Sequence, residues 1–202
     1  MRPTGTNILI AISILAASFV LCQPASAESY NDGFNAAETL EGRYFTISVE
    51  NGVDMQGLAM KVAVSPSITA IIKESVASYD SDKVADQLDL LFLAVSEIMD
   101  IRMRSFKCKV KVCKDASSLS AIALKLFDKE TTAGGFYVVS LDTIYVDANS
   151  ITTNVLGHEL SHAVQSHYFV VPPPMKIQEV LAGYVEFQLR KYTNTLPTSS
   201  RK

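Results

Sequence analysis

Runs of β-branched and aromatic residues, separated by turn residues, predict four short strands in the chain. Residues 44–49 form such a run, which an Asn-Gly turn ends. Residues 107–113 alternate charged and apolar side chains, as a strand with one face in water does. Residues 136–139 and 143–146 are apolar runs joined by a short link, which predicts a β-hairpin.

Apolar residues spaced three or four positions apart predict helices around these strands. The longest such pattern is 82–103, with Asp82 expected to cap its start. Residues 58–64 fit a short helix or a strand, and 28–42 are predicted to be a loose N-terminal arm. Helices mixed with strands in this way predict an α+β fold. The other helices are expected to begin at Pro66, at Ser117 or Ser118, at Thr152 or Thr153, and at Lys176.

The N-terminus has the pattern of a cleavable signal peptide. Arg2 is followed by an almost unbroken apolar run over 8–21, and small residues precede a cut after Ala27. Cys22 leaves a lipoprotein signal as the second interpretation, although the preceding Leu21 is larger than such a signal prefers. An uncleaved N-terminal anchor ranks third. We therefore expect an exported protein, periplasmic or secreted.

Residues 28–192 are expected to form a single domain, followed by a disordered Thr/Ser/Pro-rich tail over 193–202. No stretch after the signal peptide is long and apolar enough to predict a membrane span. The formal charge of −3 gives no basic excess that would indicate a nucleic-acid partner.

Two cysteines remain after the predicted cut, Cys108 and Cys113. Residues five apart on a straight strand point to opposite faces, so a bridge between them needs a bend. In an exported protein a structural disulfide is favoured over two free thiols.

The strongest chemical signal is the sequence His158-Glu159-Leu160-Ser161-His162, which has the His-Glu-x-x-His pattern of zinc metallopeptidases. On an α-helix its two histidines lie only about 40° apart, one turn above the other, so both can bind one cation. Glu159 lies about 60° from His162, beside the metal, where it can take a proton from a metal-bound water. His167 is about 180° from His158 and is expected to be structural or solvent-facing.

Catalytic zinc usually has three protein ligands and one open position. Downstream of the motif the chain contains only two carboxylates, Glu179 and Glu186. They are seven residues apart, so both can lie on one face of the last predicted helix, and either could be the third ligand.

The motif, a short connector and then Glu179-Val180-Leu181-Ala182-Gly183-Tyr184-Val185-Glu186 resemble the gluzincin (thermolysin-like) metallopeptidases, and most closely their small bacterial branch. The resemblance covers about residues 134–190. It implies a zincin-like fold with a small mixed sheet and an edge hairpin packed on the metal helix. It also implies that Glu179 binds zinc and that the hairpin supports an extended substrate.

One position departs from the thermolysin pattern, in which an acid shortly after the ligand Glu supports a histidine. Gly183 and Tyr184 offer no such acid, so orientation of the histidines must come from backbone carbonyls or from Glu186.

The resemblance implies zinc-dependent hydrolysis of a peptide or protein substrate, with Glu159 as general base and then proton donor to the leaving amine. Tyr184 and His167 are the candidates for stabilising the oxyanion by residue type. Three alternatives stay open: action on another amide or ester, an exported zinc-binding interaction module with little activity, and an ordinary core helix without metal.

Overall fold

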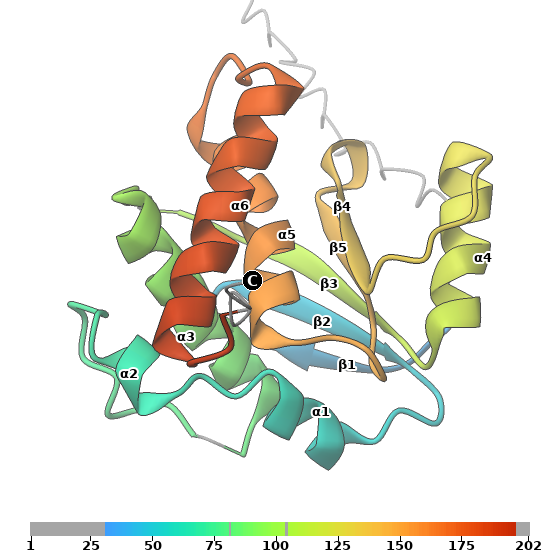
Figure 1. The fold of residues 1–202 in the computed structure, drawn as a ribbon. Helices are drawn as coiled ribbons and strands as arrows, with labels where there is room; N and C mark the ends of the chain where they lie inside the picture. The colour runs from blue at the N-terminus through green and yellow to red at the C-terminus, as the bar shows by residue number, and fades with distance from the viewer. Residues whose placement is uncertain (1–30, 81, 104, 197–202) are drawn as a thin grey trace, which may run out of the picture.

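The centre of the molecule is a five-stranded mixed sheet with the order β1-β2-β3-β5-β4 (Figure 1). The computed structural model describes residues 31–80, 82–103 and 105–196, so the predicted signal peptide, 1–27, lies outside the described residues. β2, β3 and β5 run parallel, and β1 and β4 are antiparallel strands at the two edges. The strands are β1 (Ala36–Glu41), β2 (Phe45–Glu50), β3 (Cys108–Cys113), β4 (Gly135–Val138) and β5 (Thr143–Asp147).

Six α-helices in the described part of the chain cover the two faces of this sheet. The large core joins one face to α1, α3, α5 and α6, whereas a smaller core joins the other face to α4. The predicted α+β class is therefore confirmed. The helices are α1 (Met55–Lys61), α2 (Pro66–Thr69), α3 (Val84–Met99), α4 (Ala116–Phe127), α5 (Thr153–Tyr168) and α6 (Met175–Tyr192).

The two cysteines of β3 belong to different cores, and the predicted disulfide is wrong. Cys108 lies in the large core and Cys113 in the small one, and both are free, buried thiols. The strand between them is straight enough to pair over its whole length with β2 and β5. Side chains five residues apart therefore face opposite sides of the sheet, as strand geometry requires.

The N-terminal segment is more ordered than the sequence suggests. β1 lies within 28–42, which was expected to be a loose arm, and it pairs with β2 along its length. Every residue of β1 except the half-buried Leu40 is exposed, so the strand has no apolar alternation by which it could be recognised. Its order comes from backbone pairing at the sheet edge.

Several helix boundaries also differ from the prediction. Residues 58–64 prove to be mostly helical, in α1, and the helix at Pro66 ends after one turn. α3 starts at Val84 with Lys83 rather than Asp82 at its N-cap position, and α6, with 18 residues, is the longest helix described. α4 is capped by Asp115, two residues before Ser117 and three before Ser118, which were expected to do so.

The described part of the predicted tail, residues 193–196, makes a turn whose Thr195 hydroxyl accepts a hydrogen bond from Asn154, while 197–202 lie outside the described residues. Among the helices described, none has both the length and the hydropathy that a membrane crossing requires.

Candidate metal centre

Helix α5 carries the His-Glu-x-x-His motif and is fixed at both its start and its crossing with α6. The Thr152 hydroxyl accepts a hydrogen bond from the Val155 N–H at 3.3 Å and caps the helix. At Gly157 a Cβ atom would lie 2.1 Å from a methyl group of the buried Leu189 in α6, so only glycine fits without a shift. This close crossing brings the side chains of α6 over the motif.

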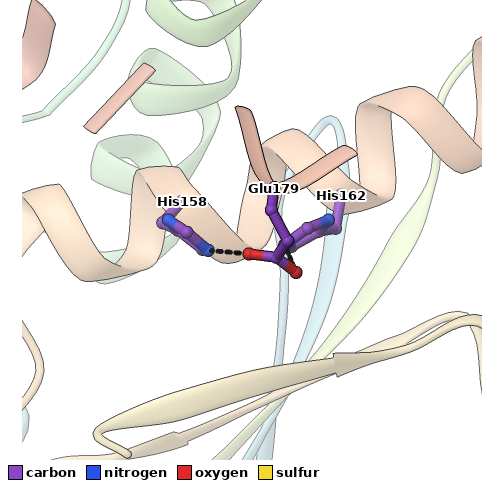
Figure 2. Close-up of side chains that lie close together, drawn as sticks. All are labelled: His158, His162 and Glu179. Atoms are coloured by element: carbon purple, nitrogen blue, oxygen red, sulfur yellow. Dashed lines mark ion pairs between the residues drawn. The ribbon is translucent and has the colours of Figure 1, made fainter. Parts of the chain in front are cut away.

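Three side chains from the two helices converge at one point (Figure 2). A ligand atom of His158, one of His162 and one carboxylate oxygen of Glu179 all lie within 4.8 Å of one another. Glu179 Oε2 is 3.6 Å from His158 Nε2, and Oε1 is 3.6 Å from His162 Nε2. The structure thus brings together the three residues that the sequence proposed as metal ligands.

This donor set fits zinc. Ligands at about 2.0–2.1 Å from a tetrahedral zinc lie about 3.3 Å from one another. Glu179 is 3.6 Å from each histidine nitrogen and the whole set spans up to 4.8 Å, so zinc binding requires the side chains to close by about 1.5 Å at most. Two imidazole nitrogens and one carboxylate also form a set found in catalytic zinc sites. The carboxylate of Glu179 is 56% exposed, so the site opens to solvent on that side.

The environment of His162 favours the neutral form of its imidazole. His162 is half-buried, and this burial lowers the pKa of its imidazole; the nearby Glu179 acts in the opposite direction and His158 in the same one. A lowered pKa favours the unprotonated ring, which is the form that coordinates a metal.

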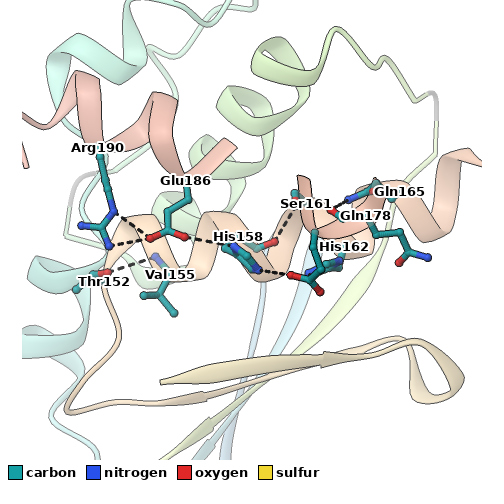
Figure 3. A network of polar contacts seen from close by, with 10 residues as sticks. Thr152, Val155, His158, Ser161, His162, Gln165, Gln178, Glu186 and Arg190 are labelled. Carbon is teal, nitrogen blue, oxygen red and sulfur yellow. Dashed lines mark hydrogen bonds and ion pairs between the residues drawn. The ribbon is translucent and has the colours of Figure 1, made fainter. Parts of the chain in front are cut away.

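Glu186 lies behind His158 and not with the converging ligand atoms (Figure 3). Its Oε2 is 3.3 Å from His158 Nδ1, while its Oε1 accepts hydrogen bonds from Arg190 Nε and Nη2 at 2.9 and 2.7 Å. His158 Nδ1 is buried and has no hydrogen bond of good geometry in the described structure. The contact is therefore close in distance but poorly aligned, and a small rotation of the ring would make it a hydrogen bond that leaves Nε2 free for a metal.

Glu159 points to the edge strand. The N–H of Tyr137 in β4 donates a hydrogen bond to Glu159 Oε2 at 3.0 Å. Burial raises the pKa of Glu159 to about 8; Glu179 and Glu186 add to the rise, and the Tyr137 N–H opposes it. A carboxyl group that titrates near neutral pH is suited to accept and return a proton.

His167 takes no part in the cluster, as helix geometry predicts. Its Nε2 is 2.8 Å from Asp142 Oδ1, and its ring packs against Phe106 at 4.8 Å between centroids. Tyr184 lies about 140° around α6 from Glu179 and is half exposed. Neither candidate for oxyanion stabilisation lies beside the converging ligand atoms.

Two residues near the site were missed at the sequence level, Tyr137 and Arg190. Tyr137 acts through its backbone, which residue type does not reveal. Arg190 follows Glu186 by four residues on α6, and this helical spacing for an ion pair was a readable signal.

A scan against protein-family models, a search of curated proteins and a search of solved structures each find no match for this chain. The chemical interpretation of the site therefore rests on its residues and their geometry.

Proposed function

We propose that the protein is a zinc-dependent metallopeptidase with a zincin-like fold. The observation that carries the proposal is the convergence of His158, His162 and Glu179 on one point, with Glu159 next to His158 in the sequence and its carboxylate held by the Tyr137 N–H. His158, His162 and Glu179 would hold the metal. Zinc bound there would polarise a substrate carbonyl and would lower the pKa of a bound water to about 7.

The remaining steps belong to the side chains of the chain itself. Glu159 accepts the proton of the attacking water and returns it to the leaving amine. The Tyr137 N–H orients the carboxylate that does this. Glu186, itself held by Arg190, fixes the ring of His158 from behind.

Strand β4 provides the place for an extended peptide. Asp147 N–H donates to Gly134 O, so the backbone groups of residues 134, 136 and 138 face β5 and those of 135 and 137 face the free edge. The free edge at Tyr137 also meets Glu159, the proposed base. The Tyr137 N–H is taken by Glu159, so a peptide paired with this edge would use the N–H and carbonyl of Gly135 and the carbonyl of Tyr137. Its own carbonyls would then pass the side chains of His158, His162 and Glu179.

Peptide hydrolysis by the zinc-loaded protein, compared with a Glu159→Gln variant and with a chelated sample, tests this proposal. We expect cleavage that is lost on chelation, and that falls by about 10²–10⁴-fold in Glu159→Gln while zinc stays bound. Equal cleavage by both proteins would overturn the role of Glu159. Zinc binding without cleavage of any peptide would favour the exported zinc-binding interaction module.

A further inference from the structure

A hollow of about 390 Å³ lies beside β4 on the side of the sheet that α4 covers. Residues from the end of α4, from the loop that follows it and from the edge strand line this hollow. Its apolar walls are Ala123, Phe127, Ala133 and Phe136. None of these residues belongs to the metal cluster.

The hollow and the metal cluster lie on opposite faces of the same edge strand. Tyr137 packs against the large core, and its hydroxyl donates to Asp142 at 3.0 Å. Phe136, its neighbour, points the other way, stacks on Tyr145 and meets Phe127 edge-on at 5.5 Å between centroids. Because side chains alternate along a strand, this opposition is built into β4.

A peptide paired with β4 must show the same alternation. Alternate side chains of the peptide would face the α5 side, and the others would face the α4 side. A peptide residue directly opposite Phe136 would have its Cβ about 4.5–5.5 Å from the Cβ of Phe136. Phe136 is itself one wall of the hollow, so this side chain would lie next to the hollow. We propose that the hollow is a specificity subsite for one large apolar or aromatic side chain of the substrate, an inference that rests on the proposed peptidase function.

The chemistry of the walls selects this class of side chain. Phe127 is 52% exposed, contacts Phe136 in an edge-to-face arrangement and lines the hollow. Lys129 and Glu130, the two charged residues of the lining, have opposite signs and lie in one loop, so they give no net preference for a charged substrate. A hollow of this volume accommodates an aromatic ring, for which contact with Phe127 and Phe136 is favourable.

A peptide scan tests the subsite. Alanine-based decapeptides with lysine at both ends, each carrying one Phe at a different position, are offered to the zinc-loaded protein. We expect one Phe position, counted from the cleaved bond, to raise kcat/KM about tenfold or more over the all-alanine peptide. Phe127→Ala should lower that gain by removing a wall. Ala133→Phe should abolish it by filling the hollow.

Leu124→Ala is the matched control, because Leu124 is 46% exposed on the same helix and does not line the hollow. It should keep the Phe preference. The proposal is overturned if no position prefers Phe, or if Leu124→Ala and Phe127→Ala change the preference equally.

Binding of the same peptides to the Glu159→Gln protein separates this inference from the proposed function. If the wild-type protein cleaves nothing, yet Glu159→Gln binds one Phe peptide about tenfold more tightly than the alanine peptide and Phe127→Ala removes the difference, the subsite stands and hydrolysis fails. Cleavage or binding that is indifferent to Phe at every position rejects the subsite and leaves the metallopeptidase proposal intact.

Discussion

Two groups of ionisable side chains lie on opposite faces of the sheet, and they differ in how their charges are satisfied. On the α4 side, the buried Asp32 carboxylate accepts hydrogen bonds from Lys111 and Tyr145, and from the backbone N–H of Phe34 at 3.0 Å. On the α5 side, Glu179 comes within 3.6 Å of both His158 and His162 without a hydrogen bond between them.

The difference separates a structural role from a chemical one. A buried carboxylate that accepts several hydrogen bonds from the protein needs no further partner. Asp32 therefore holds the N-terminal segment against β3 and β5. Two imidazoles and a carboxylate that converge offer lone pairs to a common point, which a cation would complete. Clustering of charged residues alone would not distinguish the group around Asp32 from the group around Glu179.

Removing the Asp32 carboxylate should have the largest effect on the stability of the fold. Asp32→Ala leaves the Lys111 ammonium without its buried partner, and we expect it to lower the free energy of unfolding by about 3 kcal/mol. Urea denaturation measures this change. Zinc affinity should be unaltered, because Asp32 is on the far side of the sheet.

Glu41→Ala is the control for that experiment, since it removes an exposed ion pair with Lys107. Its cost should be much smaller, because water screens an exposed pair. Equal losses in the two variants would mean that the buried pair has no special structural role.

Glu186→Gln tests whether Glu186 positions His158 for metal binding. Loss of the carboxylate that contacts His158 Nδ1 should weaken zinc binding by about 10–100-fold, as such supporting residues typically do. Competition with a fluorescent zinc chelator measures the affinity. Unfolding of the zinc-free protein should change far less, and an unaltered zinc affinity would contradict the positioning role.

Acid should act on the Asp32 group in a predictable direction. Burial acts to raise the pKa of Asp32, but the hydrogen bonds from Lys111, Tyr145 and Phe34 outweigh it and hold the pKa below its usual value. A carboxyl group with a depressed folded-state pKa contributes its full stability above its unfolded-state pKa, about 3.9. This contribution is lost as the pH falls from there through the lower folded-state pKa. Urea titrations between pH 5 and 2, with the wild-type protein and Asp32→Ala compared, should show a shallower loss in the variant; parallel losses would contradict it.

The smallest expected effect concerns the N-cap of α5. Thr152→Ala removes the N-cap of α5 and should destabilise the fold by about 1 kcal/mol. Asp115→Ala removes the cap of α4 at a similar cost and serves as the comparison. Thermal unfolding measures both. If the α5 cap also positions the histidines, only Thr152→Ala should lower zinc affinity; equal zinc affinity in both variants would limit the cap to stability.

The elements with strong periodicity were predictable from the sequence. The motif helix, the hairpin of β4 and β5, and the strand at 107–113 all appear where the pattern indicated them, because each buries a regular apolar face. The convergence of His158 and His162 followed from helix geometry alone. Glu179 required a resemblance, since Glu186, seven residues further along the same helix, is of the same residue type and can lie on the same face.

The features that escaped prediction depend on contacts distant in sequence. β1 is ordered by pairing with β2 and not by apolar residues of its own. The Asp32–Lys111 pair joins residues that no local pattern connects. The hydrogen bond from Tyr137 to Glu159 involves a backbone group, so no side-chain pattern marks it. The prediction of a disulfide was wrong because pairing with β2 and β5 keeps β3 straight, which puts Cys108 and Cys113 on opposite faces of the sheet.

The measurement that tests the central claim most directly is the zinc content of the purified protein and of its Glu179→Ala and Glu186→Ala variants. We predict close to one zinc per chain in the wild-type protein, none retained by Glu179→Ala, and retention with weaker affinity by Glu186→Ala. Zinc lost only from Glu186→Ala would move the third ligand to that residue. No zinc in any form, even after zinc is added, would contradict the metal centre and with it the proposed peptidase.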